Sequence, residues 1–108
     1  MNVPEMETLR YLCGAIIHQW WRLNGKWHRE DGPAHIDYYE SGAVRYQEWS
    51  LNGKRHREDG PAVIRYHKSG AIKSQQYWWN GTKYPDIKTD EGWTRRLLLH
   101  KIRDVMQS

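Results

Sequence analysis

Two copies of one loop carry the residues in this sequence that could perform acid–base or metal chemistry. The letters HREDG occur at 28–32 and again at 56–60, inside the phrases LNGKWHREDGPA and LNGKRHREDGPA. An imidazole beside two carboxylates can act as a general acid and base, and the same atoms can bind a metal ion. An active site usually needs a constellation that occurs once, whereas shared folding constraints explain a loop that occurs twice. We therefore interpret His28 and His56 as scaffold, with no catalytic and no metal-binding role.

The remaining motifs do not indicate an enzyme either. The sequence has no nucleophile elbow, phosphate-binding loop, zinc signature or dinucleotide fingerprint. Cys13 stands where later copies have Ser41 and Ser69, which is typical of a replaceable turn residue rather than a nucleophile. As the single cysteine it cannot form an internal disulfide, which indicates a reducing compartment. We expect a protein without catalytic residues, cofactors or bound metal.

The chain around these loops repeats every 28 residues. The segments CGAIIHQWWRLNG, SGAVRYQEWSLNG and SGAIKSQQYWWNG, which begin at Cys13, Ser41 and Ser69, superpose without gaps. Their recurring residues stand at alternate positions, the period of a β-strand, so one face is specified and the opposite face varies. The specified face carries Ala15, Gln19, Trp21 and Leu23 in the first copy, Ala43, Gln47, Trp49 and Leu51 in the second, and Ala71, Gln75, Tyr77 and Trp79 in the third.

An Asn-Gly pair ends each of these strands, at 24–25, 52–53 and 80–81. This dipeptide favours a type I′ hairpin turn because both residues tolerate positive φ. Each returning strand should be interrupted at Glu-Asp-Gly-Pro and resume as AHIDYY or AVIRYH. There Gly32 and Gly60 would permit a bend or bulge, and the aspartates would bond the turn's own amides. A second turn, at the letters ESG or KSG, leads to the next copy.

These patterns predict a mainly β fold, an antiparallel β-meander of about six strands built from hairpin repeats, with one C-terminal amphipathic α-helix packed on a sheet face. Residues 1–108 would form a single domain. It would comprise an N-terminal half repeat over 1–13, hairpin repeats over 14–84 and the helix over 90–106. The helix should begin with Asp90 as its N-cap and pack on the Trp-bearing face. Its apolar stripe is expected to be Leu98, Ile102, Val105 and Met106.

The recurring letters resemble a known family. The skeleton NGKxHREDGPAxIxYxxSGAIxxxxYWxNG is similar to the MORN-repeat variant class of β-hairpin repeats, and more narrowly to the NGKxHRxDGPA repeats of small bacteriophage and large DNA virus proteins. The likeness covers about 13–84, but the period is longer than the usual MORN unit and the helix is not part of it. It implies an interaction scaffold, such as a phage-encoded accessory or anti-defence protein that binds and inhibits or redirects a host protein complex. It transfers no functional residue.

Two groups of residues are candidates for partner binding. Trp21, Trp49 and Tyr77 are expected in the core, beside glutamines that would form a hydrogen-bonded ladder. The variable face should stay open, and exposed aromatic clusters mark interfaces. The basic helix residues could contact phosphate or an acidic protein. The predicted partner-binding residues are His18, Trp20, Tyr46 and Trp78 on the sheet and Arg95, Arg96, Lys101 and Arg103 on the helix.

Charge and hydropathy leave several kinds of partner open. The net charge of +4 tolerates an anionic partner without demanding one. A host protein is the first prediction, and the alternative is a nucleic acid or nucleotide bound by the basic helix and the aromatic sheet face. Pairing of open sheet edges could also give a homodimer or higher oligomer. No apolar run reaches the roughly 18 residues that span a membrane, and the acidic N-terminal segment does not resemble a signal peptide. We expect a soluble cytoplasmic protein.

Overall fold

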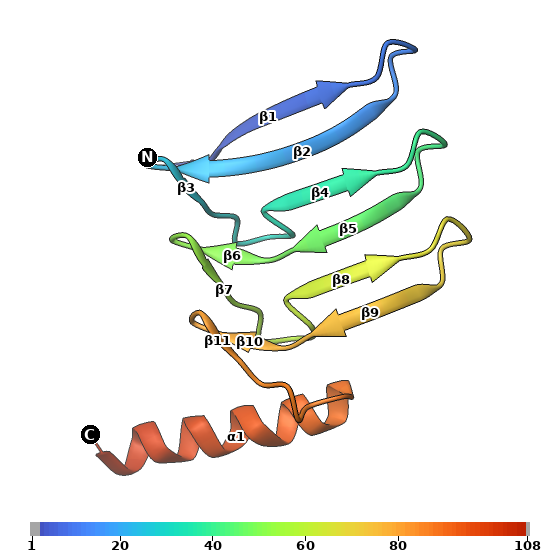
Figure 1. The fold of residues 1–108 in the computed structure, drawn as a ribbon. Helices are drawn as coiled ribbons and strands as arrows, with labels where there is room; N and C mark the ends of the chain where they lie inside the picture. Colours follow the sequence, from blue (N-terminus) through green and yellow to red (C-terminus); the bar gives the residue numbers. More distant parts are fainter. Residues whose placement is uncertain (1–2, 108) are drawn as a thin grey trace.

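The chain folds into a thin antiparallel sheet with one helix beyond its last strands (Figure 1). The computed structural model describes residues 3–107 and measures 55 × 37 × 17 Å. The main sheet has the order β1-β2-β4-β5-β8-β9, which is the predicted meander. Its strands are β1 (Glu5–Arg10), β2 (Ile16–Leu23), β4 (His35–Tyr38), β5 (Val44–Glu48), β8 (Val63–Tyr66) and β9 (Ile72–Gln76).

Short strands form hairpin tips along one side of this sheet (Figure 1). They are β3 (Lys26–Trp27), β6 (Ser50–Leu51), β7 (Lys54–Arg55), β10 (Trp78–Trp79) and β11 (Thr82–Lys83). β3 pairs with the end of β2, β6 with β7, and β10 with β11. The tips are also joined to one another, because the N–H of Gly53 donates to the carbonyl of Trp27 and the N–H of Gly81 to that of Arg55, both at 2.9 Å.

The Asn-Gly turns have the predicted backbone conformation. Asn24, Asn52 and Asn80 have φ values of 53°, 52° and 44°, and the glycine that follows each of them also has positive φ. Asparagine and glycine tolerate this left-handed region better than other residues, which is why the dipeptide identifies the hairpin. The local turn chemistry therefore sets where each strand reverses.

The half repeat at the N-terminus occupies the place that β4 and β8 occupy in later units. β1 pairs antiparallel with β2 as β4 pairs with β5. The connecting turn is also the same, since the N–H of Tyr11 donates to the carbonyl of Ala15 and the N–H of Tyr39 to that of Ala43. Residues 1 and 2 of the predicted half repeat lie outside the described residues.

The HREDGP loop is hydrogen-bonded to the Asn-Gly turn of the next unit. The Nδ1 of His28 accepts a 3.0 Å hydrogen bond from the N–H of Asn52 in the following Asn-Gly turn. The guanidinium of Arg29 lies 3.9 Å from the ring centre of Trp21 and donates to Asp31 and to the carbonyl of Pro33. The second loop repeats these contacts through the corresponding residues. These contacts are structural, as the duplication indicated.

The glycine of this loop serves a purpose that the sequence analysis did not foresee. The chain bends at Gly32 and Gly60 as predicted, but neither residue has positive φ, so the bend itself does not require glycine. A Cβ at Gly32 would lie 2.9 Å from Cζ of Arg29, and one at Gly60 would lie 3.1 Å from Cζ of Arg57. Glycine therefore leaves room for the arginine that covers the tryptophan.

The recurring glutamines do not form the expected ladder. The hydroxyl of Tyr38 donates to Oε1 of Gln19, and that of Tyr66 donates to Oε1 of Gln47, both at 2.7 Å. Gln75 is exposed. Each bonded glutamine thus fixes a tyrosine of the neighbouring strand, and the glutamines do not bond one another.

The helix α1 (Asp90–Gln107) closes the end of the sheet at β10 and β11 (Figure 1). Tyr77 takes the place of Trp21 and Trp49 in the third unit, where the arginine position is occupied by Pro85. Trp93 covers it instead, with the ring centres 5.5 Å apart. The indole N–H of Trp93 also donates to the carbonyl of Arg57 at 3.0 Å.

The predicted apolar stripe of this helix is wrong. Trp93 and Leu97 are buried against Tyr77, whereas the four stripe residues are 47–80% exposed. The N-cap also differs, because the hydroxyl of Thr89 accepts from the N–H of Gly92 while Asp90 accepts from the Tyr77 hydroxyl. The stripe residues are Leu98, Ile102, Val105 and Met106. Within residues 3–107, no helix combines the length and apolarity that crossing a membrane requires.

Candidate functional site

The variable face of the sheet carries an open groove of about 810 Å³. Strand register arranges its residues in two neighbouring rows that cross the sheet. The first row contains His18, Asp37, Tyr46 and Arg65, and the second contains Trp20, His35, Glu48 and Val63. Side chains at directly opposed positions on one sheet face lie within contact distance. The groove is therefore built where the repeated units differ from one another.

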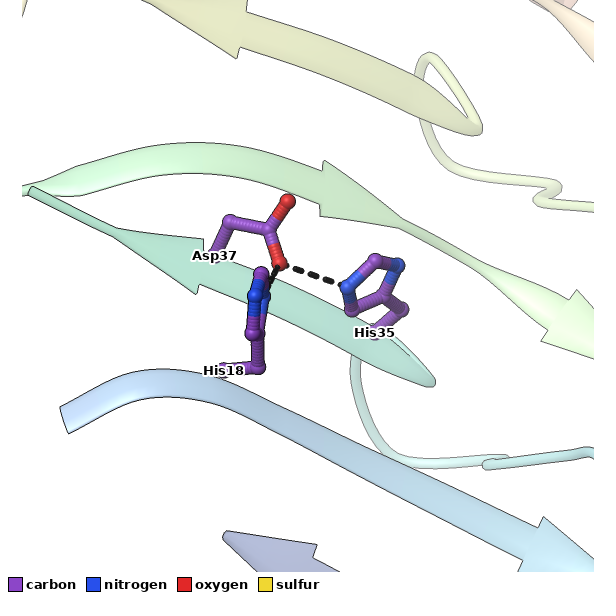
Figure 2. Close-up of side chains that lie close together, drawn as sticks. All are labelled: His18, His35 and Asp37. Atoms are coloured by element: carbon purple, nitrogen blue, oxygen red, sulfur yellow. Dashed lines mark hydrogen bonds and ion pairs between the residues drawn. The ribbon is translucent and has the colours of Figure 1, made fainter. Parts of the chain in front are cut away.

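Three potential metal ligands converge at one end of this groove (Figure 2). His18 on β2 stands directly opposite Asp37 on β4, and its Nδ1 contacts Oδ1 of that carboxylate. His35 lies two residues before Asp37 on the same strand face, and its Nε2 is 2.6 Å from the same oxygen. One donor atom from each of the three residues lies within 4.8 Å of the others.

The surroundings of Asp37 determine its ionisation. Burial by itself raises the pKa of this carboxyl, but hydrogen bonds from His35 and His18 and their charges lower the pKa by more. The net result is a pKa below the ordinary value of 3.8, so the carboxylate is ionised at neutral pH. An anionic oxygen thus stands between two imidazoles.

Packing fixes the ring of His35. Its centre lies 4.6 Å from that of Trp27 and 5.4 Å from that of Tyr46. The Nδ1 of this ring is buried and has no hydrogen-bond partner, and the same holds for Nε1 of Trp20. Unpaired buried polar atoms are uncommon in folded proteins. This end of the groove therefore has two buried nitrogen atoms that bond no described residue.

Glu48 organises the middle of the groove. This carboxylate is 6% exposed and accepts hydrogen bonds from the hydroxyl of Tyr46 at 2.6 Å and from Nε of Arg55 at 2.9 Å. Burial, followed by the hydrogen bond to Glu48, raises the pKa of Tyr46 to about 12. The guanidinium of Arg55 also lies 4.9 Å from the ring centre of Trp78. These contacts are satisfied and rigid, so they support the groove.

Three further cations line the groove without a carboxylate partner among the side chains that the structure describes. Arg65 lies 5.0 Å from the ring centre of Tyr46, and Arg45 lies 5.8 Å from that of Tyr39. Lys73 on the edge strand β9 is the third. None of the three takes part in an ion pair within the described chain. The groove consequently has a surplus of positive charge.

The structure brings together part of the predicted binding surface. His18 and Tyr46 line the groove, and Trp20 contacts His18 with ring centres 6.1 Å apart. Trp78 connects to them only through Arg55. Among the four predicted helix residues, Arg95 bonds Glu91 and Arg96 bonds Asp86, both at 3.0 Å. Lys101 and Arg103 are exposed on the same helix, beyond β10 and β11 and apart from the groove (Figure 1).

Several site residues escaped the sequence analysis, among them His35, Asp37 and the groove cations Arg45, Arg65 and Lys73. A signal for His35 and Asp37 exists in the comparison of AHIDYY with AVIRYH, where the second copy has Val63 and Arg65 at the corresponding positions. His18 likewise corresponds to Tyr46. The conspicuous HREDG loops, by contrast, assemble no group of three ligands within residues 3–107. The potential metal ligands are therefore residues that differ between the copies of the repeat.

Comparisons of the chain with protein-family models, with curated proteins and with solved structures gave no match. The resemblance to MORN-type repeats therefore stays a prediction from the motifs.

Proposed function

We propose that this protein is a non-enzymatic binding module that holds an acidic segment of a partner protein in the groove of its variable face. The proposal rests on the unpaired cations Arg45, Arg65 and Lys73, which line an open groove beside aromatic rings. Complementary charge favours encounter with an acidic segment and suppresses other partners. Tyrosine, tryptophan and arginine are also the side chains that most often anchor protein interfaces.

The rigidity of the groove supports this proposal. Several of its residues project from the central strands β4, β5 and β8, and Glu48 accepts hydrogen bonds from Tyr46 and Arg55. A preformed surface loses little conformational entropy when a partner binds. A phage-encoded protein of this kind would act in the host cytoplasm by occupying its partner and so inhibiting or redirecting it.

A nucleic acid or nucleotide is the second candidate, because arginines and aromatic rings line this groove together. Several of these rings are already covered, since Arg65 lies over Tyr46 and Arg55 over Trp78. Single-strand binders need free aromatic faces on which bases stack. The covered rings therefore favour a protein partner.

Self-association through the outer strands is a separate proposal. The strands at the two edges of the main sheet are β1 and β9. All residues of β1 and the first four of β9 are exposed. Gel filtration with light scattering would detect a dimer. A variant with a proline in β1 should lose the dimer if the two copies pair through that edge.

Two charge-reversed variants of the full chain test the proposed groove. The first is Arg45→Glu with Arg65→Glu and Lys73→Glu. The second, a control with the same change of net charge, is Arg95→Glu with Lys101→Glu and Arg103→Glu on the helix. The probes are a labelled Glu/Asp-rich peptide containing tyrosine, the same peptide with Gln and Asn, and a single-stranded oligonucleotide.

The expected result is that the acidic peptide binds the wild type and the helix variant, and that the groove variant loses roughly tenfold or more in affinity. The wild type should still capture its partner from lysate after nuclease treatment. The groove variant should not capture it. Preference for the oligonucleotide, with affinity that falls steeply as salt rises, would replace the protein partner by a nucleic acid. Loss of binding in the helix variant alone would move the site to α1.

A further inference from the structure

The cluster of His18, His35 and Asp37 occurs once in a chain that otherwise repeats its residues. In the second unit the corresponding positions are occupied by Tyr46, Val63 and Arg65, which cannot reproduce it. The fold does not require these three side chains, because β5 and β8 pair in the same register as β2 and β4 without them. Folding alone therefore does not explain why these three side chains are present.

We propose that His18, His35 and Asp37 form a binding site for a divalent transition-metal ion of the Zn²⁺ class. Two imidazole nitrogens and one carboxylate oxygen make a borderline donor set, which suits zinc and its neighbours in the first transition row. Magnesium and calcium prefer ligand sets made of oxygen alone. The three ligands lie in the groove proposed for the acidic partner, but the assignment of a metal does not depend on that partner.

The positions of the donors allow an ion to enter with small movements. Zinc binds imidazole nitrogen and carboxylate oxygen at about 2.0–2.2 Å, so tetrahedral ligands lie about 3.3 Å apart. The Nε2 of His35 and Oδ1 of Asp37 are 2.6 Å apart, and the ion would lengthen this contact by roughly 0.7 Å. The contact of His18 Nδ1 with the same oxygen would have to lengthen as well. Rotations of the carboxylate and of the two rings would provide both changes with the backbone of β2 and β4 in place.

Metal binding would fix the tautomer of His35. Coordination through Nε2 requires the tautomer with hydrogen on Nδ1. This Nδ1 is buried and has no acceptor among the described residues, so its N–H needs a water molecule as the outer partner that metal-bound imidazoles have. The ring stays in place through its packing against Trp27 and Tyr46.

Exposure gives the site an entry path and an open ligand position. The side chain of His18 is 36% exposed, against 16% for His35 and 22% for Asp37. The neighbouring cations are held elsewhere, with Arg65 over the ring of Tyr46 and Arg55 bonded to Glu48. Three protein ligands leave the fourth position of a tetrahedral ion to water or to a donor atom that enters from the groove.

Isothermal titration calorimetry of chelator-treated full-length protein with ZnCl₂ tests this site. The matched variants His35→Val and His18→Tyr install the residues that the second unit carries at Val63 and Tyr46, so both are compatible with the hairpin. The controls Cys13→Ser and His67→Gln remove an exposed thiol and an exposed imidazole. The ¹⁵N resonances of the imidazoles, recorded with and without zinc, locate the ion in the wild-type protein even if a variant fails to fold.

We expect one equivalent of zinc in the wild type and in both controls, with selective shifts of the His18 and His35 ring nitrogens. Each ligand variant should lose more affinity than the roughly 10- to 100-fold that follows loss of an outer-shell partner. Zinc binding that disappears in Cys13→Ser, or that leaves the two rings unshifted, would overturn the site. Equal affinity for magnesium would overturn the assigned metal class.

Discussion

The backbone N–H of Asn52 donates a hydrogen bond of 3.0 Å to Nδ1 of His28, which belongs to the loop of the preceding unit. Asn80 and His56 repeat this relationship at the same distance. The Asn-Gly turn leaves the asparagine N–H without a partner in its own hairpin, and the imidazole of the neighbouring unit supplies one. The histidine of HREDG thereby joins each hairpin tip to the next.

Replacement of His28 should distinguish this acceptor role from simple packing. In His28→Leu the N–H of Asn52 loses its partner, and we expect the free energy of unfolding to fall by about 1–3 kcal/mol. In His28→Asn the side-chain oxygen can replace Nδ1, so the loss should be smaller. Urea unfolding monitored by circular dichroism measures both, with His67→Leu as an exposed control. Equal losses in the two variants would show that the acceptor contributes nothing.

His56 should make stability depend on pH. Burial lowers its pKa below the ordinary value of 6.5, although the carboxylate of Glu58 acts in the opposite direction. The folded state therefore binds fewer protons than the unfolded state in this range. The resulting stability is fully present above the unfolded pKa and is lost as pH falls from about 6.5 toward the folded pKa.

Urea unfolding between about pH 7 and pH 5 measures this effect. The wild type should lose stability over that interval, and His56→Asn, which keeps an acceptor for Asn80 but does not titrate, should lose less. His67→Asn removes an exposed imidazole and should retain the wild-type slope. A slope that is unchanged in His56→Asn would contradict the assignment to this histidine.

Local chemistry made much of the fold predictable. The Asn-Gly turns depend on the φ preferences of two adjacent residues, so their positions followed directly from the letters. The helix was predicted over 90–106 and extends over Asp90–Gln107. Its buried side was not predictable from helical spacing, because Trp93 packs on Tyr77 only where the covering arginine of earlier units is replaced by Pro85. The packing of α1 therefore depends on a departure from the repeat.

Differences between the copies also explain which residues of the candidate site could be predicted. His18 and Tyr46 were found because strand alternation places them on the variable face. His35 and Asp37 were missed because attention to recurring residues leads to HREDG, which is scaffold. Their meeting with His18 depends on the register of β2 with β4, which is set by the connection that contains the HREDGP loop. Comparing the copies for differences would have identified both residues.

The arginine of the loop should not be replaceable by lysine. The guanidinium of Arg57 lies 3.8 Å from the ring centre of Trp49 and donates to Asp59 and to the carbonyl of Pro61. A lysine cannot stack as a plane and bond both acceptors, so Arg57→Lys should cost about 1–2 kcal/mol in urea unfolding. Arg45→Lys, at an exposed position, should change stability by less than about 0.5 kcal/mol. Similar values for the two variants would argue against the stacking role.

Trp93 should contribute more to stability than any residue of the predicted helix stripe. It is 1% exposed, packs on Tyr77 and Tyr84, and bonds the carbonyl of Arg57. Trp93→Ala should therefore reduce the free energy of unfolding by about 3–5 kcal/mol. Trp93→Phe keeps much of the ring packing but leaves the carbonyl without its donor, and its loss should be intermediate.

The matched control for this prediction is Leu98→Ala. Leu98 is 57% exposed, and alanine preserves helix propensity, so stability should change by less than about 0.5 kcal/mol. Urea unfolding of the three variants, monitored by tryptophan fluorescence and circular dichroism, ranks them by their loss of stability. If Leu98→Ala proved as costly as Trp93→Ala, the helix would be packed through its other side. The covering of Tyr77 by the helix would then not be what ends the sheet.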